Sequence, residues 1–142
     1  MLDPVSKEFV LSVRVYFEDT DAGGVVYHAS YLKFFERART EFLRLLGWNQ
    51  GELLKNASCA FVVSDLSIQY KRPAKLDDIL VIRTSLKELR RASFVFEQRA
   101  FRDDVLMTSA QVRVVCISPS TGRPLPIPED MYKEIEQLTC VA

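Results

Sequence analysis

The sequence is poor in the residues that build metal sites and disulfide frameworks. Its 142 residues include three cysteines, Cys59, Cys116 and Cys140, and one histidine. The cysteines are odd in number and widely separated, and no pair forms the short C-x-x-C spacing typical of structural zinc sites. We therefore expect reduced thiols and a protein without metal. Cys59 and Cys116 stand in apolar, strand-like runs, which favours burial over reactivity.

The chain also lacks an excess of either charge and has no long apolar run. Nineteen Lys and Arg balance 19 Asp and Glu, which disfavours nucleic acid as a bulk partner because its binding depends on positive charge. The longest apolar run is the five residues 59–63, whereas a membrane-spanning helix needs about 20. Residues 1–9 lack the apolar stretch of a secretory signal. We expect a cytoplasmic protein with no membrane span.

The remaining composition is that of a folded domain. Hydrophobic residues make up 48% of the chain and charged residues 27%, which excludes a disordered tail. A chain of this length can bury a sizeable core. We expect one domain over residues 1–142.

Hydrophobic periodicity divides the chain into strands and helices. Alternation from Phe9 to Phe17 predicts a half-buried strand. Apolar residues between His28 and Leu46 recur every three or four positions, which predicts a long helix that Gly47 ends. The expected core face of this helix is Tyr31, Phe35, Ala38, Phe42 and Leu45. The other expected elements are a helical turn over 50–55, strands over 60–70, 79–86, 93–102 and 105–117, and a helix over 128–138.

These elements predict an α+β architecture. Four consecutive strands after one long helix favour an antiparallel meander. The apolar helix face and the inward strand positions can be buried together only if the sheet wraps around the helix. The edges of such a sheet favour dimerisation by strand pairing.

The segment between the first strand and the helix carries an arrangement suited to catalysis. Asp21 stands on a loop with Gly23 and Gly24, seven residues before His28 at the predicted helix start. The first turn of a helix presents free backbone N–H groups that can hold an oxyanion. Asp21 can then attack a carbonyl or activate water, while the amide near His28 stabilises the developing charge. This pairing suits ester or thioester cleavage.

A purely structural interpretation fits the same residues. Acids before a helix often complement its dipole, so Asp19 or Asp21 can simply cap the helix. Glu18 and Asp19 are interpreted as solvated loop charges. For the His28 side chain, an orienting hydrogen bond at the helix start is preferred over proton transfer.

Residues 16–28, followed by Glu36-Arg37-Ala38-Arg39, closely resemble a known enzyme family. The spacing D-x-x-G-x-V-Y-H from Asp21 to His28 is its most specific feature. The stretch resembles the hot-dog-fold acyl-CoA thioesterases of the 4-hydroxybenzoyl-CoA thioesterase type, nearest to the Tol–Pal-associated (YbgC-type) branch. Residues 70–78 and 87–94 also match, so the resemblance covers nearly the whole domain.

The resemblance implies a fold, an assembly and a site. The hot-dog fold is a five-stranded antiparallel sheet wrapped around one long helix, paired into dimers and commonly tetramers, with active sites at subunit interfaces. Asp21 matches the catalytic carboxylate, as nucleophile or general base, and the His28 backbone N–H matches the donor to the thioester oxygen. The His28 side chain is a further catalytic candidate, and Gly24 and Tyr27 are expected beside the substrate.

The resemblance also implies a binding site for the phosphates of coenzyme A. Arg90 and Arg91 lie between two predicted strands at the family's phosphate-binding position, and guanidinium groups suit such contacts. Ala92 replaces a basic residue that some relatives carry. Without the resemblance, two arginines in a hairpin are usually solvated. Lys71, Arg72 and Lys75 form a second basic cluster, in which Arg72-Pro73 is interpreted as a turn.

We therefore expect an enzyme that cleaves acyl-CoA to free acid and coenzyme A without a metal or organic cofactor. Two alternatives remain: a non-catalytic module that binds acyl-CoA or an acyl carrier protein, and an enoyl-thioester hydratase in which His28 is the working base. Asp21 and its glycine-bearing loop favour the hydrolase, because binding alone needs no carboxylate aimed at a carbonyl.

Overall fold

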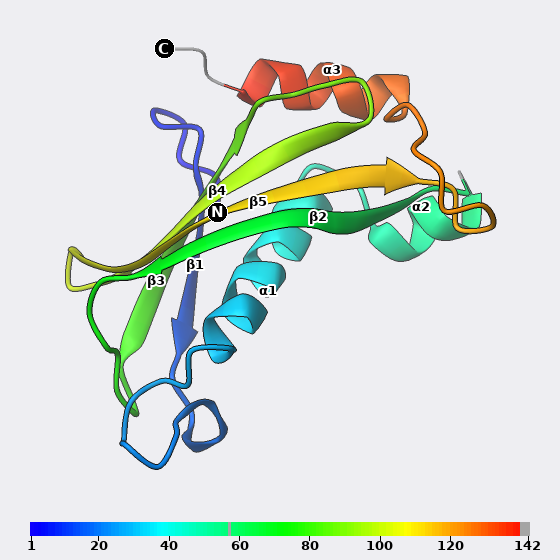
Figure 1. Ribbon diagram of the computed structural model, residues 1–142. Helices are drawn as coiled ribbons and strands as arrows, with labels where there is room; N and C mark the ends of the chain where they lie inside the picture. Colours follow the sequence, from blue (N-terminus) through cyan, green and yellow to red (C-terminus); the bar gives the residue numbers. More distant parts are fainter. Residues whose placement is uncertain (57, 140–142) are drawn as a thin grey trace.

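The protein forms a curved antiparallel sheet that wraps around a long helix (Figure 1). The structure is a computed structural model that describes residues 1–56 and 58–139. The strands of this part are β1 (Phe9–Arg14), β2 (Ala60–Tyr70), β3 (Ile79–Lys87), β4 (Ser93–Arg102) and β5 (Val105–Ile117). The helices are α1 (Ser30–Leu45), α2 (Gln50–Asn56) and α3 (Glu129–Leu138), and a 3₁₀ turn, η1, spans Phe17–Asp19. The predicted α+β class is confirmed.

The strand order corrects one prediction. The order is β1-β3-β4-β5-β2, and every neighbouring pair is antiparallel. Strands β3, β4 and β5 form the expected meander, but its extension to β2 is wrong. β1 and β4 occupy the two edges of β3, so β2 pairs with the free edge of β5 instead. β1 and β2 are therefore the two edges of the sheet.

The long helix buries one face against the sheet. The predicted core residues that are at most 2% exposed are Tyr31, Phe35, Ala38 and Phe42. The prediction for Leu45 is wrong, since its side chain is 54% exposed. The helix ends at Leu45, and Leu43 takes the last buried position instead. The apolar spacing thus predicts the helix face correctly except at its C-terminal end.

Gln98 of β4 fixes the middle of α1 to the sheet. Its fully buried side chain donates from Nε2 to the Phe35 carbonyl oxygen at 2.9 Å and to the Thr84 hydroxyl at 3.0 Å. The Arg39 guanidinium donates to Gln98 Oε1 at 3.0 Å. Desolvation lowers the pKa of Arg39, and the charge of Glu36 opposes this shift. Because the buried amide is fully hydrogen-bonded, it positions α1 without leaving a buried polar group unpaired.

The first strand and the long helix are shorter than predicted. β1 ends at Arg14 rather than Phe17 because the chain turns into η1. α1 begins at Ser30 rather than His28. The other predicted boundaries are confirmed to within one residue or two. In the part of the chain that the structure describes, no helix is long and apolar enough to cross a bilayer.

Candidate active site

A tight loop between η1 and α1 holds Asp21. The Asp21 N–H donates to the Val25 carbonyl oxygen at 2.9 Å, and the Asp21 carbonyl oxygen accepts from the Gly24 N–H at 3.0 Å. The carboxylate oxygen Oδ1 accepts from the Gly23 N–H at 2.8 Å. The side chain is exposed, and within the described residues Oδ2 makes no hydrogen bond. The loop therefore orients the carboxylate while leaving one oxygen for a ligand or water.

The backbone conformation favours glycine at position 24, and Gly23 leaves room for the Asp21 carboxylate. Gly24 has φ +80°, a conformation that costs an L-residue with a side chain about 1–2 kcal/mol. A Cβ at Gly23 would lie 3.2 Å from Asp21 Oδ1. A larger residue at either position therefore strains the loop or displaces the carboxylate.

The start of α1 presents backbone N–H groups near this loop. The Tyr27 carbonyl oxygen accepts from the Ser30 N–H at 2.8 Å. In the described residues the N–H of His28 donates to no acceptor, and Ala29 at the N-cap has no side-chain hydrogen bond. Neither Asp19 nor Asp21 caps α1. The purely structural interpretation of these acids as helix caps is therefore wrong.

A cavity of about 300 Å³ joins the loop, the helix start and the end of β2. Its walls include Asp21, His28, Tyr31 and Tyr70, and the remaining lining residues are Val25, Val26, Lys71, Arg72 and Pro73. The Tyr70 hydroxyl donates to the His28 carbonyl oxygen at 2.9 Å, which ties β2 to the helix start. Burial, with a smaller contribution from Tyr31, raises the pKa of Tyr70. Tyr70 thus remains a neutral hydrogen-bond donor at physiological pH.

The predicted role of Asp19 is wrong. Its side chain is 7% exposed, and its Oδ2 accepts from the Tyr16 N–H at 2.8 Å. Its carbonyl oxygen accepts from the Tyr27 N–H at 2.8 Å and from the Ser30 hydroxyl at 3.2 Å. Asp19 therefore holds the two ends of the loop together. Glu18, by contrast, is exposed as expected.

The structure brings Asp21 and His28 together, but it does not place all predicted substrate residues in the cavity wall. Gly24 and Tyr27 are absent from that wall. Gly24 acts through the loop conformation, and the Tyr27 ring lies against the His28 ring at 4.5 Å between centroids. Tyr70 was missed by sequence reasoning, since no local pattern links a strand residue to a helix start 42 positions away.

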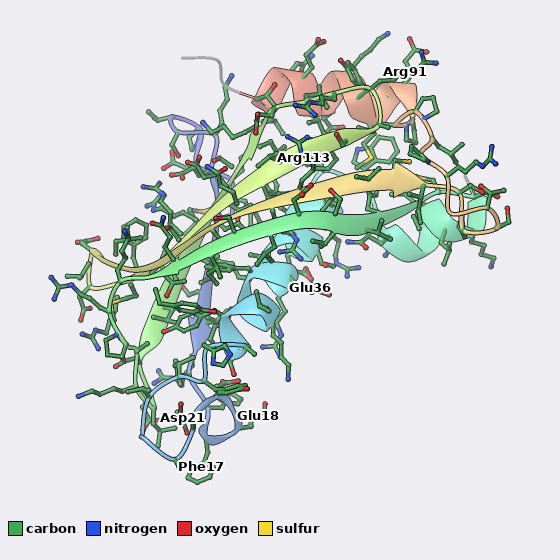
Figure 2. The ribbon with its side chains drawn as sticks, viewed as in Figure 1. Phe17, Glu18, Asp21, Glu36, Arg91 and Arg113 are labelled. Carbon is green, nitrogen blue, oxygen red and sulfur yellow. The ribbon has the colours of Figure 1, made fainter. Side chains whose placement is uncertain are left out.

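Arg90 and Arg91 lie far from Asp21 in the same chain. Both are exposed in the β3–β4 hairpin, where the Arg90 N–H donates to the Ser93 carbonyl oxygen at 2.7 Å. Figure 2 shows Arg91 beside α3, at the opposite end of the molecule from Asp21. One chain therefore does not bring the predicted phosphate-binding residues to the predicted catalytic carboxylate.

The fold and site place the chain in a family of hydrolases. Residues 15–135 match the thioesterase-like superfamily, and the chain belongs to it. It is 49% identical over 130 residues to the acyl-CoA thioesterase YbgC of Haemophilus influenzae, covering 92% of this chain and 96% of that protein. It is 47% identical over 126 residues to the acyl-CoA thioester hydrolase YbgC of Escherichia coli, and the match covers 88% of this chain and 93% of that protein.

The solved structures agree with this assignment. A probable thioesterase from Bartonella henselae is 39% identical to the chain and superimposes with a TM-score of 0.82, covering 85% of this chain and 99% of that one. The family resemblance and the hot-dog fold predicted from the sequence are confirmed.

Proposed function

We propose that the protein hydrolyses acyl-CoA thioesters to a free acid and coenzyme A, with Asp21 as the catalytic carboxylate and the His28 N–H as oxyanion donor. One observation carries this assignment: an exposed carboxylate and the amino end of α1 border a single cavity. The names of the two YbgC relatives support acyl-CoA as the substrate class.

The proposed reaction uses groups of the chain and water, and it requires no metal or organic cofactor. The thioester carbonyl oxygen accepts from the His28 N–H, where the α1 dipole stabilises the negative charge that develops. Asp21 then has two roles open to it. As a nucleophile it forms a mixed anhydride and releases coenzyme A, and water cleaves the anhydride. As a general base it takes a proton from the water that attacks the carbonyl.

In the described residues the His28 ring makes aromatic contacts rather than the orienting hydrogen bond expected from the sequence, and we assign it an orienting role through these contacts. Its ring lies between Tyr27 and Tyr70, at centroid distances of 4.5 Å and 6.4 Å. These aromatic contacts hold the ring, and the Tyr70 hydroxyl holds the peptide between His28 and Ala29. The Ser30 N–H donates to the Tyr27 carbonyl oxygen at 2.8 Å and so holds the peptide that carries the His28 N–H. A fixed peptide keeps the oxyanion donor in place before the substrate arrives.

A panel of acyl-CoA esters assayed for free thiol tests the activity. We expect thiol release above background for at least one short, long or aromatic acyl group, and the rates will identify the preferred class. Acyl groups attached to an acyl carrier protein are tested in the same assay as the alternative thioester substrate. Binding of these esters without thiol release would contradict the hydrolase assignment.

The cytoplasm remains the predicted location of the protein.

The active form is proposed to be a dimer formed through β2. Within residues 1–56 and 58–139 this edge strand leaves its outer backbone groups without a strand partner, and it exposes Val63, Leu66 and Tyr70 by 49%, 43% and 46%. An edge strand with unpaired backbone groups and exposed apolar side chains favours pairing with a second chain. The resemblance further predicts that two such dimers form a homotetramer.

The dimer explains the position of Arg90 and Arg91. The β3–β4 hairpin lies at the same end of the sheet as the start of β2, because the Cys116 N–H donates to the Ala92 carbonyl oxygen and Ala60 pairs with Ile117. Antiparallel pairing along the whole of β2 places this end of the second copy beside Tyr70 and the cavity of the first. The second copy can then supply arginines to the coenzyme A phosphates.

Leu66→Arg is expected to break the dimer and lower thioester hydrolysis at least tenfold, because a charge in an apolar strand interface cannot be buried unpaired. Light scattering after gel filtration gives the mass, and free thiol gives the rate. Val105→Arg is the matched control, since Val105 is 41% exposed but lies in the β4–β5 hairpin. A dimeric and fully active Leu66→Arg variant would exclude the β2 interface.

Gly24→Val is expected to lower both stability and activity. The positive φ of Gly24 makes a β-branched residue unfavourable by about 1–2 kcal/mol, and the distorted loop moves Asp21. Gly122→Val is the control, because Gly122 has φ +72° in a turn outside the cavity wall. Urea unfolding should show a similar decrease in the free energy of unfolding for both variants, whereas kcat should fall only in Gly24→Val. Equal kcat values would show that the loop conformation does not position Asp21.

A further inference from the structure

Two buried cysteines outside the candidate active site lie side by side. Cys59 directly precedes β2, and Cys116 is in the last part of β5. Their side chains are 2% and 0% exposed, and the two sulfur atoms are 2.7 Å apart. Both are free thiols, and a disulfide bond is about 2.05 Å long. Only a small movement of the two sulfurs therefore separates the observed pair from a covalent bond.

The backbone on both sides of the pair is already fixed by hydrogen bonds. Phe61, two residues after Cys59, is paired with Cys116 in the β2–β5 ladder. The Cys59 N–H donates to the Leu53 carbonyl oxygen at 3.2 Å, and the Cys116 N–H donates to the Ala92 carbonyl oxygen at 2.7 Å. A bond between the sulfurs thus joins segments that the fold already holds together.

We propose that Cys59 and Cys116 form a dithiol site that a low-molecular-weight disulfide converts into an intrachain disulfide. The Cys59 sulfur attacks one sulfur of the oxidant, releasing one small thiol and leaving a mixed disulfide. The Cys116 sulfur then attacks the Cys59 sulfur and releases the second small thiol. The two protein thiols are oxidised, and their hydrogens are found on the two thiols that leave.

The surroundings determine which thiol reacts first. Cys59 borders a cavity of about 220 Å³ that is also lined by the exposed residues Gln50, Gly51 and Leu54. Burial, reinforced by the neighbouring Cys59, raises the pKa of Cys116 to about 12. Cys59 is therefore the thiol that meets the oxidant, and Cys116 is the resolving thiol.

The bond should stabilise the fold without rearranging it. It closes a loop that contains β2, β3, β4 and nearly all of β5, and closing a long loop restricts the unfolded chain. The cysteines lie at the end of β2 opposite Tyr70, so the wall of the Asp21 cavity does not include them. Within one chain the site is thus separate from the proposed catalytic residues, whereas the proposed β2 dimer brings this end of β2 beside Tyr70 of the second copy.

Oxidised glutathione is the probe for this site. The full chain carrying Cys140→Ser leaves Cys59 and Cys116 as the two thiols, and Cys140 itself lies outside the described residues. After oxidation, blocking of free thiols and proteolysis, mass spectrometry should find the peptides of Cys59 and Cys116 joined. The melting temperature should rise by several degrees and return to its starting value on reduction.

Matched variants distinguish the Cys59–Cys116 disulfide from other oxidation products of the chain. Cys59→Ser and Cys116→Ser, each in the Cys140→Ser background, should give no joined peptides and no reversible rise in melting temperature. Two thiols that are still free after oxidation would overturn the proposed site. A glutathione adduct that persists on Cys59 without closure onto Cys116 would overturn it equally.

Discussion

Asp21→Asn is expected to lower kcat for acyl-CoA hydrolysis by about a thousandfold, equivalent to about 4 kcal/mol of transition-state stabilisation. Asparagine matches the carboxylate in shape, so its side-chain oxygen can still accept from the Gly23 N–H as Asp21 Oδ1 does at 2.8 Å. An amide can neither attack the carbonyl nor accept a proton from water. The loss should therefore fall on kcat, with KM and coenzyme A affinity little changed.

Glu18→Gln is the control for this substitution. Glu18 is also an exposed acid of the same segment, but it does not line the cavity. Free-thiol assays should give this variant the rate of the unsubstituted protein. Equal activity of the Asp21→Asn variant and the unsubstituted protein would remove Asp21 from the catalytic role.

Single-turnover hydrolysis in ¹⁸O water distinguishes the two roles of Asp21. A nucleophile forms an anhydride, and when water attacks the Asp21 carbonyl carbon the label remains in the carboxylate. A general base leaves the Asp21 carboxylate unlabelled. Mass spectrometry of the peptide that carries Asp21 detects this label, which enters the carboxylate only through the anhydride route.

Phe35→Ala is expected to lower the free energy of unfolding by about 3–5 kcal/mol, because it leaves a cavity between α1 and the sheet. The Phe35 side chain is fully buried, and its backbone carbonyl oxygen accepts the Gln98 hydrogen bond that anchors the helix. Urea unfolding at one protein concentration measures the change, since dimerisation would make stability concentration-dependent.

Leu32→Ala is the comparison for the core substitution. Leu32 is also in α1, but its side chain is 37% exposed. We expect its substitution to cost about 1 kcal/mol or less. A loss at Phe35 no larger than the loss at Leu32 would show that α1 does not form the centre of the core.

Local patterns predicted most of the fold because burial imposes a period on the sequence. The three- and four-residue spacing of Tyr31, Phe35, Ala38 and Phe42 identified the buried face of α1, and alternation located the strands. The pairing of β2 with β5 was missed, since strand order depends on which edges other strands occupy. Leu45 was misassigned because periodicity does not show where a helix leaves the core.

The candidate site was predictable only where its residues are close in sequence. Asp21 and His28 were found because the loop and the helix start are adjacent in the chain. Asp19 was interpreted as a solvated charge, yet it is buried and holds the loop through backbone hydrogen bonds that composition does not reveal. Tyr70 reaches the site only through the folded sheet. The distance between Arg91 and Asp21 likewise became visible only in three dimensions (Figure 2).

The most direct test is a crystal structure with an acyl-CoA analogue in which a methylene group replaces the thioester sulfur. Such a ketone keeps the carbonyl but cannot release a thiol. We predict that its oxygen lies about 2.9 Å from the His28 backbone nitrogen, with the carbonyl carbon facing the Asp21 carboxylate. A carbonyl bound away from the start of α1, with Asp21 turned toward solvent, would contradict the proposed mechanism.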